Sequence, residues 1–171
     1  MGTIRITSGI LKGRSLHTPG GKTHPMGERE RLALFNMINE HLPGAEIIDA
    51  FSGSGALGVE ALSRGAKRVV FIEKDPQAVR TIRQNLAELK IDGEVLMGNV
   101  LDFQDTKLYD LIIADPPYDK FEIKSVEHLT QFLKPGGLLV LSHPDKDVLI
   151  AGLKLLKTKK YAAARISIYS K

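Results

Sequence analysis

The 171-residue sequence contains no cysteine and no tryptophan, and aromatic residues make up only 6% of it. Without cysteine the chain cannot form disulfide bonds, thiolate metal sites or cysteine nucleophiles, which excludes base methylation at pyrimidine C5 through a cysteine adduct. The five histidines lack metal-ligand spacing, so we expect no metal. No apolar run approaches the ~20 residues that cross a bilayer, and no signal-peptide pattern opens the chain. We therefore expect a cytoplasmic protein with no membrane partner.

Positive charge is concentrated at both ends of the chain. Residues 1–25 carry four lysines and arginines and no acid, and residues 151–171 carry six and no acid. Because the net charge is +4, the stretch between these ends carries −6. Such a distribution favours a polyanionic partner. The candidate nucleic-acid-binding residues of the N-terminal segment are Arg5, Lys12, Arg14, Lys22 and His24. The C-terminal lysines suit equally well the protection of an exposed edge strand.

The chain after residue 43 alternates between short apolar stretches and helical patterns. Strands are expected at 47–51, 68–73, 94–97, 109–114 and 138–141, and helices at 55–64, 76–89, 122–133 and 145–152. An earlier helix of about 15 residues follows Pro25, with Leu32, Phe35 and Ile38 at helical spacing. The alternation predicts an α/β fold with a parallel sheet covered by helices on both faces.

Two closing strands, at about 153–161 and 165–170, are joined too closely for a parallel crossover and must form an antiparallel hairpin. The predicted architecture is thus the Rossmann-like fold of S-adenosylmethionine-dependent methyltransferases. It has a mostly parallel seven-stranded sheet, an antiparallel C-terminal hairpin and a small N-terminal β-rich extension. We expect one methyltransferase domain over residues 1–171, with a basic extension at 1–25 and a catalytic core at 26–171. Nothing in the sequence requires more than a monomer.

A glycine-rich loop, DAFSGSGALG, runs from Asp49 to Gly58 between a predicted strand and a predicted helix. Gly53 and Gly55 allow the backbone to approach a ligand closely. The spacing also satisfies the dinucleotide pattern GxGxxG, so NAD is an alternative. Asp49 stands where its carboxylate can accept from the ammonium group of a methionine moiety, whereas it would repel a pyrophosphate. This position favours S-adenosylmethionine as the cofactor.

Two later strand ends complete the predicted cofactor site. Glu73 ends the next strand, where an acid can accept both ribose hydroxyls. Asn99 and Val100 follow the third strand, where an amide and a backbone N–H can meet an adenine edge. The full set of expected cofactor-binding residues is Asp49, Phe51, Gly53, Ser54, Gly55, Glu73, Lys74, Asn99 and Val100.

A second loop, Asp115-Pro116-Pro117-Tyr118, directly follows the fourth predicted strand, and these four are the candidate catalytic residues. An exocyclic base amine is a poor nucleophile because its lone pair is delocalised into the ring. Asp115 and the carbonyl of Pro116 can accept hydrogen bonds from the two N–H groups of this amine and hold its nitrogen in line with a methyl donor. Consecutive prolines fix the backbone. Tyr118 offers a ring on which a flipped base can stack.

With both loops in place, the sequence resembles the bacterial small-subunit (16S) ribosomal RNA guanine-N2 methyltransferase family over essentially its whole length. The matching stretches are Arg5 to Arg14, Leu34-Phe35-Asn36, Asp49 to Gly58, Glu60 to Ala66, Phe71 to Asp75, Asp115 to Tyr118 and Leu133 to Gly137. The resemblance implies methylation of one guanine in small-subunit rRNA, within a partly assembled 30S subunit. It also implies cofactor contacts from Asp49, Glu73 and Asn99, and an N-terminal segment that helps to hold RNA.

Four departures from the family pattern leave the target nucleotide open. The family reads T-R-P-T where this chain has Thr23-His24-Pro25-Met26, and Glu28 replaces a usual aspartate two residues later. Asn99 replaces a frequent acid, and Ser142-His143 replaces a frequent Glu-His pair. Two other hypotheses remain. One is methylation of a different amine, such as adenine N6 in DNA or RNA or a protein glutamine. The other is a non-catalytic module that binds S-adenosylmethionine during assembly.

Overall fold

The computed structural model describes residues 2–20, 26–144, 146–161 and 164–171, so the candidates Lys22 and His24 lie outside the described residues. The strands are β1 (Thr3–Arg5), β2 (Ser15–His17), β3 (Glu46–Ala50), β4 (Arg68–Glu73), β5 (Glu94–Met97), β6 (Tyr109–Ala114), β7 (Leu133–Pro144), β8 (Lys154–Tyr161) and β9 (Ala164–Ser170). The α-helices are α1 (Glu28–Ile38), α2 (Ala56–Ser63), α3 (Pro76–Leu89) and α4 (Ile123–Thr130). The 3₁₀ helices are η1 (Asn39–His41), η2 (Val100–Asp102) and η3 (Tyr118–Lys120).

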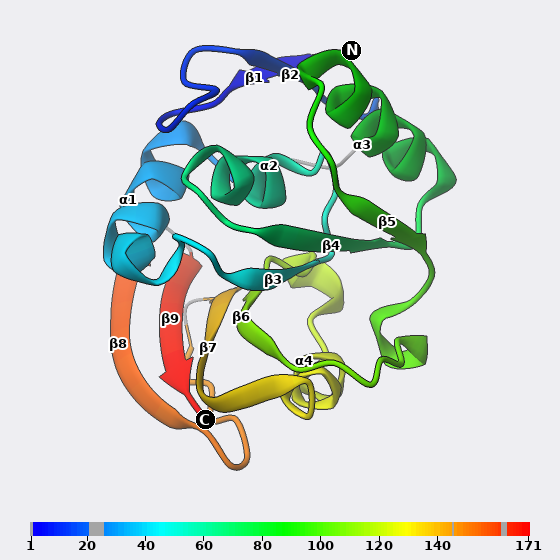
Figure 1. The fold of residues 1–171 in the computed structure, drawn as a ribbon. Coiled ribbons are helices and arrows are strands. Elements are labelled where there is room, and N and C mark those ends of the chain that lie inside the picture. Colours follow the sequence, from blue (N-terminus) through cyan, green and yellow to red (C-terminus); the bar gives the residue numbers. More distant parts are fainter. Residues whose placement is uncertain (1, 21–25, 145, 162–163) are drawn as a thin grey trace.

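The main sheet has seven strands in the order β5-β4-β3-β6-β7-β9-β8 (Figure 1). The first five run parallel, β9 is antiparallel to β7, and β8 is antiparallel to β9. The predicted parallel sheet with a reversed C-terminal hairpin is therefore confirmed. The strand order reverses between β3 and β6, and ligands of such sheets bind outside the carboxyl ends of the strands at this point.

Two hydrophobic cores lie on opposite faces of the sheet. Ile47 of β3 and Leu111 of β6 pack with α1, α2 and α3, whereas the next residues, Ile48 and Ile112, pack with α4. Successive side chains of a strand point to opposite faces, so continuous apolar strands feed both cores. Figure 1 shows α2 and α3 on one side of β3, β4 and β5, with α4 on the other.

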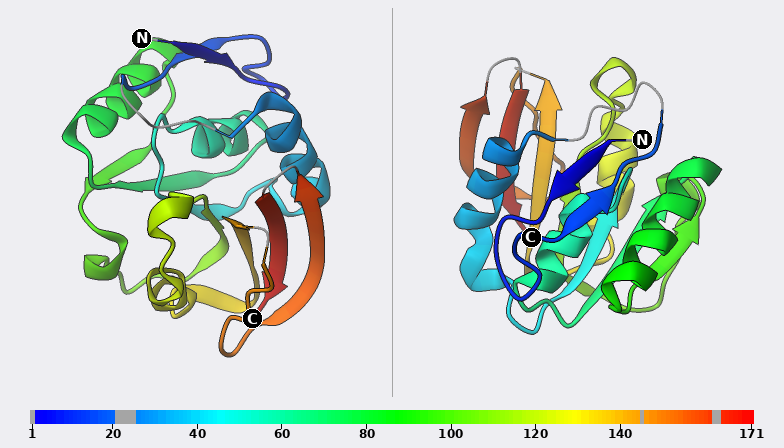
Figure 2. Two further views of the ribbon diagram at one scale, coloured as in Figure 1. Left: turned by 180° about the vertical axis from the view of Figure 1, so that it is seen from behind. Right: turned by 90° about the horizontal axis from the view of Figure 1, so that it is seen from above.

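The N-terminal hairpin of β1 and β2 covers α2 and α3 on the outside of the molecule (Figure 2). Ile6, Leu11 and Leu16 are buried and join the core of that face. Ile10, which the sequence pattern also marks as an apolar anchor, is 85% exposed.

One predicted helix is wrong. Within the described part of residues 145–152, the chain forms no helix but continues from β7 in an irregular path. Val148 and Ile150 are buried against the core on the α4 face, while Leu149 between them is 80% exposed. This alternation is the period of extended chain, and the apolar surface beside α4 selects it over a helix.

Helix α1 buries a different face from the one that its apolar residues predict. Leu32 is 41% exposed, and Arg31 takes its place on the buried face beside Phe35 and Ile38. The strand predicted at 138–141 is also longer, because β7 begins at Leu133.

Candidate active site

The glycine loop lies between β3 and α2 in a tight backbone conformation. Phe51, Gly53 and Gly55 all have positive φ, at 59°, 55° and 78°. Gly55 precedes α2, and its N–H donates to the carbonyl of Ser52 at 2.7 Å. A Cβ on Gly55 would meet Ile82 at 3.3 Å in addition to the backbone strain, so glycine is required here.

Asp49 lies beneath this loop and is 1% exposed. Its Oδ2 accepts from the N–H of Gly58 at 2.8 Å, while Oδ1 has no partner among the described residues. Burial, opposed by that hydrogen bond and reinforced by the charges of Asp115 and Glu73, raises the pKa of Asp49 well above its ordinary value. A buried carboxyl with an unpartnered oxygen fits a cationic ligand group, which would stabilise its ionised form.

Glu73 connects the end of β4 to the glycine loop. Its Oε2 accepts from the N–H of Gly53, and its Oε1 from the N–H of Asp75, each at 2.8 Å. A carboxylate has about four acceptor positions, so both oxygens retain capacity for ligand hydroxyls. The neighbouring Lys74 is exposed.

Asn99 and Val100 lie at the end of β5, next to β4. The N–H of Gly98 donates to the carbonyl of Glu73 at 3.0 Å, which joins the two strand ends. Asn99 is exposed, and its side-chain oxygen accepts from the N–H of Leu101 at 3.1 Å. Val100 is buried at the start of η2. Both residues thus lie at the same edge of the sheet as Asp49 and Glu73.

The loop Asp115–Tyr118 leaves the end of β6 beside the end of β3. Burial raises the pKa of Asp115 to about 6, with Ser142 lowering it through a hydrogen bond and Glu30 raising it further. The hydroxyl of Ser142 is also hydrogen-bonded to the Tyr118 hydroxyl. Ser142, 2% exposed at the end of β7, therefore holds both ends of this loop, while the Tyr118 residue remains 40% exposed. Pro116 is buried and Pro117 is exposed.

A hollow of about 80 Å³ brings the two loops together. Its lining residues are Thr18, Pro19, Met26, Arg31, Phe51, Ser52, Gly53, Ser54, Ala56, Leu57 and Asp115. The hollow therefore joins predicted cofactor residues to the first predicted catalytic residue. A larger hollow of about 280 Å³ lies at the amino ends of β6 and β7 and contains none of the predicted site residues.

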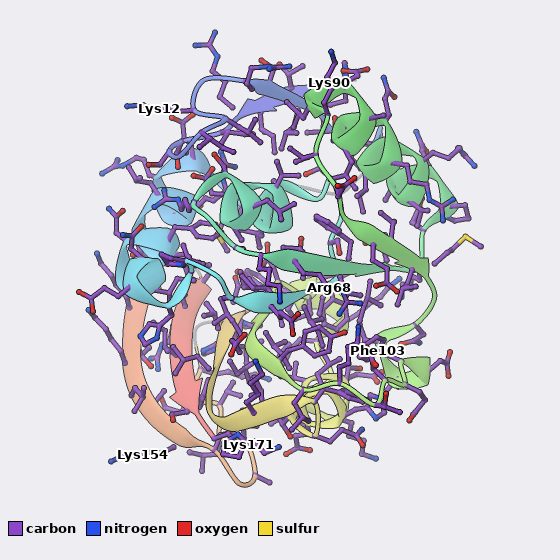
Figure 3. The ribbon with its side chains drawn as sticks, viewed as in Figure 1. Lys12, Arg68, Lys90, Phe103, Lys154 and Lys171 are labelled. Atoms are coloured by element: carbon purple, nitrogen blue, oxygen red, sulfur yellow. The ribbon has the colours of Figure 1, made fainter. Side chains whose placement is uncertain are left out.

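Three of the predicted RNA-binding residues, Arg5, Lys12 and Arg14, are exposed on the N-terminal hairpin. Lys12 extends from the turn of the hairpin into solvent, away from the sheet (Figure 3). None of the three lines the hollow, and the guanidinium of Arg14 donates to the carbonyl of Glu88 in α3.

Sequence reasoning missed two residues that contribute to the site. Arg31 lines the hollow although it lies in a helix assigned to packing, and the spacing of Arg31, Phe35 and Ile38 on one face was the available indication. Ser142 was noted only as a departure from a family pattern, and its contacts with the catalytic loop depend on the pairing of β6 with β7.

The residues present fit S-adenosylmethionine. Asp49 offers a buried anionic acceptor and Glu73 offers acceptors at the next strand end, while Gly53 has no atom within 4 Å of the position of a Cβ. In the part of the chain that the structure describes, no three acids or histidines are grouped to hold a metal ion. None of the described helices has the length and apolar character needed to cross a bilayer.

The sheet order and the two loops at its carboxyl edge define a Rossmann-like S-adenosylmethionine-dependent methyltransferase. A family model described as Conserved hypothetical protein 95 matches residues 4–170, and the chain belongs to this family, which is that of ribosomal RNA small subunit methyltransferase D. The family resemblance read from the motifs is confirmed.

Individual relatives match over nearly their whole length. The chain is 33% identical to ribosomal RNA small subunit methyltransferase D of Haemophilus influenzae, over 98% of this chain and 94% of that protein. It is 31% identical to YlbH of Bacillus subtilis, over 98% and 99% of the two chains. The solved structure of yhhF from Escherichia coli is similar with a TM-score of 0.90 and 30% identity, covering 99% and 98%.

Proposed function

We propose that this chain transfers a methyl group from S-adenosylmethionine to the exocyclic N2 amine of a guanine in small-subunit (16S) ribosomal RNA. The observation that carries the proposal is the shared hollow, in which Asp115 lies opposite the glycine loop. The RNA substrate is supported by the name of the Haemophilus influenzae relative, and the amine by the chemistry of the loop after β6.

S-adenosylmethionine supplies the methyl group and a sulfur leaving group, and the chain's task is to position the amine. The Asp115 carboxylate and the carbonyl of Pro116 accept hydrogen bonds from the two N–H groups of the amine. The two prolines keep these acceptors fixed, so little reorganisation is needed at the moment of reaction. Asp115 is also placed to take the proton that the nitrogen loses once its lone pair has formed the new bond.

Tyr118 supports the base outside its helix. Its ring is partly exposed, and its hydroxyl is anchored to the buried Ser142. An anchored ring loses little side-chain entropy when a base stacks on it. The basic hairpin with Arg5, Lys12 and Arg14 supplies phosphate contacts that hold the RNA, within a partly assembled subunit, while the base occupies the site.

The direct test is to identify the product. Purified protein is incubated with labelled S-adenosylmethionine and small subunits from cells lacking this enzyme, and the digested RNA is analysed by mass spectrometry. We expect N2-methylguanosine. N6-methyladenosine, or label in ribosomal protein instead of RNA, would contradict the proposed target, and cofactor binding without any transfer would favour the non-catalytic module.

A substitution separates catalysis from binding. We expect Asp115→Ala to reduce turnover by about 100-fold or more, because the amine loses a charged acceptor in the transition state. Cofactor affinity should stay within a few fold. Asp119→Ala is the matched control, since Asp119 is exposed just beyond the loop and should retain near-normal turnover. Near-normal turnover in Asp115→Ala would refute the assignment of the acceptor.

A further inference from the structure

A buried charge cluster lies between α1, α2 and the N-terminal hairpin. The side chains of Arg31, Arg64 and Glu60 are 2%, 5% and 1% exposed. The Nε of Arg64 is 3.0 Å from Glu60 Oε1, and the Nε of Arg31 is 3.7 Å from Glu60 Oε2. Two guanidinium groups thus share one carboxylate, which leaves an excess positive charge away from water.

The excess charge belongs to Arg31. Arg64 is satisfied, because it also donates to the side-chain oxygens of Thr7 and Asn39. The oxygens of Glu60 further accept from Thr7 N–H at 2.9 Å and from Ser8 N–H at 3.0 Å. Among the described residues, the guanidinium of Arg31 donates to the carbonyl of Arg5, and its buried Nε has no hydrogen-bond partner.

This cation faces the hollow of the active site. Arg31 lines it together with the glycine loop and Asp115, yet no ion pair joins Arg31 to Asp115 in the described structure. A buried charge without a full partner is costly, and such groups usually complete their pairing with a ligand. The group that Arg31 suits is a planar oxyanion, because a guanidinium matches a carboxylate through two parallel hydrogen bonds.

A second buried ionisable group with an unpartnered atom lies at the start of the same loop. Asp49 is buried with its Oδ1 unpartnered, and Gly58 in the first turns of α2 holds its other oxygen. A buried carboxyl and a buried guanidinium next to one glycine loop are complementary to a zwitterion, whose ammonium would stabilise the ionised carboxylate. The amino-acid part of S-adenosylmethionine carries an ammonium and a carboxylate on one carbon atom.

We propose that Arg31 binds the carboxylate of the amino-acid part of S-adenosylmethionine, opposite Asp49, which faces the ammonium. The inference rests on the proposed use of this cofactor and extends it to a residue in α1. An RNA phosphate is the other oxyanion with suitable chemistry. However, Arg31 is 2% exposed and lines the hollow beside the glycine loop, which suits a group of the cofactor better than a phosphodiester between two nucleotides.

The test compares two ligands that differ only in this carboxylate, S-adenosylmethionine and decarboxylated S-adenosylmethionine, by calorimetric titration without RNA. We expect wild type to prefer the carboxylate form by roughly 10- to 100-fold, the range of a charge-assisted hydrogen-bonded pair. In Arg31→Gln the preference should fall to within about threefold, because the remaining difference no longer involves a buried charge. Arg31→Lys, which keeps the charge, should retain part of the preference for the carboxylate form.

Arg64→Gln is the matched control. It also removes a guanidinium from Glu60 but does not line the hollow, so its ligand preference should equal that of wild type even if its melting temperature falls. If the wild-type protein binds S-adenosylmethionine and its decarboxylated form equally well, the inference is overturned without any variant. The inference is also overturned if Arg31→Gln keeps the preference for the carboxylate form but binds RNA less tightly. That result would assign Arg31 to an RNA phosphate. If wild type binds neither ligand, the proposed function fails instead.

Discussion

The carboxyl group of Asp115 ionises close to neutral pH, because burial raises its pKa to about 6. Below that value the protonated carboxyl has one acceptor oxygen fewer for the amine. We therefore expect kcat/KM for RNA, at saturating cofactor, to be constant above about pH 7 and to fall about tenfold for each pH unit well below 6. Initial rates on under-methylated subunits measure this, and a profile that stays flat down to about pH 5 would contradict it.

Ser142→Ala provides the matched variant for that profile. The Ser142 hydroxyl lowers the pKa of Asp115, so its removal should raise this pKa and shift the acid limb to higher pH. A change in rate at all pH values, without a shift of the limb, would instead mean that Ser142 acts only by holding Tyr118.

Asp49 makes the stability of the cofactor-free protein depend on pH. Its pKa is raised in the folded state, mainly by burial, so folding is favoured while the group is protonated, and this contribution is lost as pH rises towards the folded pKa. Asp49→Asn has no such loss. Between about pH 4.5 and 7.5, we expect the free energy of unfolding of Asp49→Asn to rise relative to wild type by about 1 kcal/mol or more, measured by urea denaturation.

Asp110 serves as the control, because its pKa is lowered in the folded protein whereas that of Asp49 is raised. Burial would raise its pKa, but hydrogen bonds from the N–H of Glu46 and the ammonium of Lys134 outweigh that effect and lower it. Its contribution to stability is therefore present above the unfolded pKa and lost in acid. Between about pH 4.5 and 7.5 this contribution is almost fully present, so the free energy of unfolding of Asp110→Asn relative to wild type should stay nearly constant, and parallel slopes for the two variants would contradict the assignment for Asp49.

At the scale of elements, Glu60 joins the N-terminal hairpin to α1 and α2. It accepts from Thr7 and Ser8 and pairs with Arg31 and Arg64. Because Glu60→Gln would leave two buried guanidinium groups without a carboxylate, we expect it to lower the free energy of unfolding by about 3–5 kcal/mol. Chemical denaturation checks this value.

Glu46→Gln is the corresponding surface control. Glu46 pairs with Lys67, whose side chain is 70% exposed, so its loss should cost less than about 1 kcal/mol. Equal losses in the two variants would show that the buried cluster contributes no more than a surface pair.

The sequence was sufficient for elements whose apolar pattern reports directly on the local environment. Strands β3, β4 and β6 are buried on both faces, so their continuous apolar runs identified them. The helix predicted around Val148 and Ile150 was wrong because a helix and an extended path can both bury these apolar residues. Only the surface beside α4 decides between the two. The burial of Arg31 was missed for a related reason. It depends on Glu60, which comes from another helix, α2.

At the scale of the whole molecule, the position of the site follows from the order of the parallel strands. The two loops follow β3 and β6, and the carboxyl ends of neighbouring parallel strands must meet at one edge. The sequence alone therefore assigned Asp49 and Asp115 to one edge of the sheet. Ser142 could not be assigned in this way, because its approach to Asp115 depends on the register of β6 with β7.

The distribution of charge over the molecule gives a test of RNA contact. We expect the double variant Lys12→Gln/Arg14→Gln to bind RNA less tightly and to lower the slope of log affinity against log salt by about 1.5, because each phosphate contact contributes roughly 0.7 or more. Nitrocellulose filter binding over a range of salt concentrations measures the slope.

Lys67→Gln/Lys107→Gln removes the same charge from exposed residues that precede β4 and β6, at the edge opposite the site. Its slope should remain that of wild type. Equal slopes in the two double variants would show that the hairpin makes no phosphate contacts.

The position of β9 has a consequence for how the protein is made. During synthesis β8 emerges before β9, yet in the folded sheet β9 lies between β7 and β8. Among the described strands, β8 pairs with β9 alone, so it stays unpaired while the ribosome adds the following strand. The register of β7 with β9, from Leu138 to Pro144, includes Ser142, which holds the catalytic loop. β9, the neighbour of β7 at Ser142, is therefore the last strand of the sheet to be made, and β8 can join the sheet only after it.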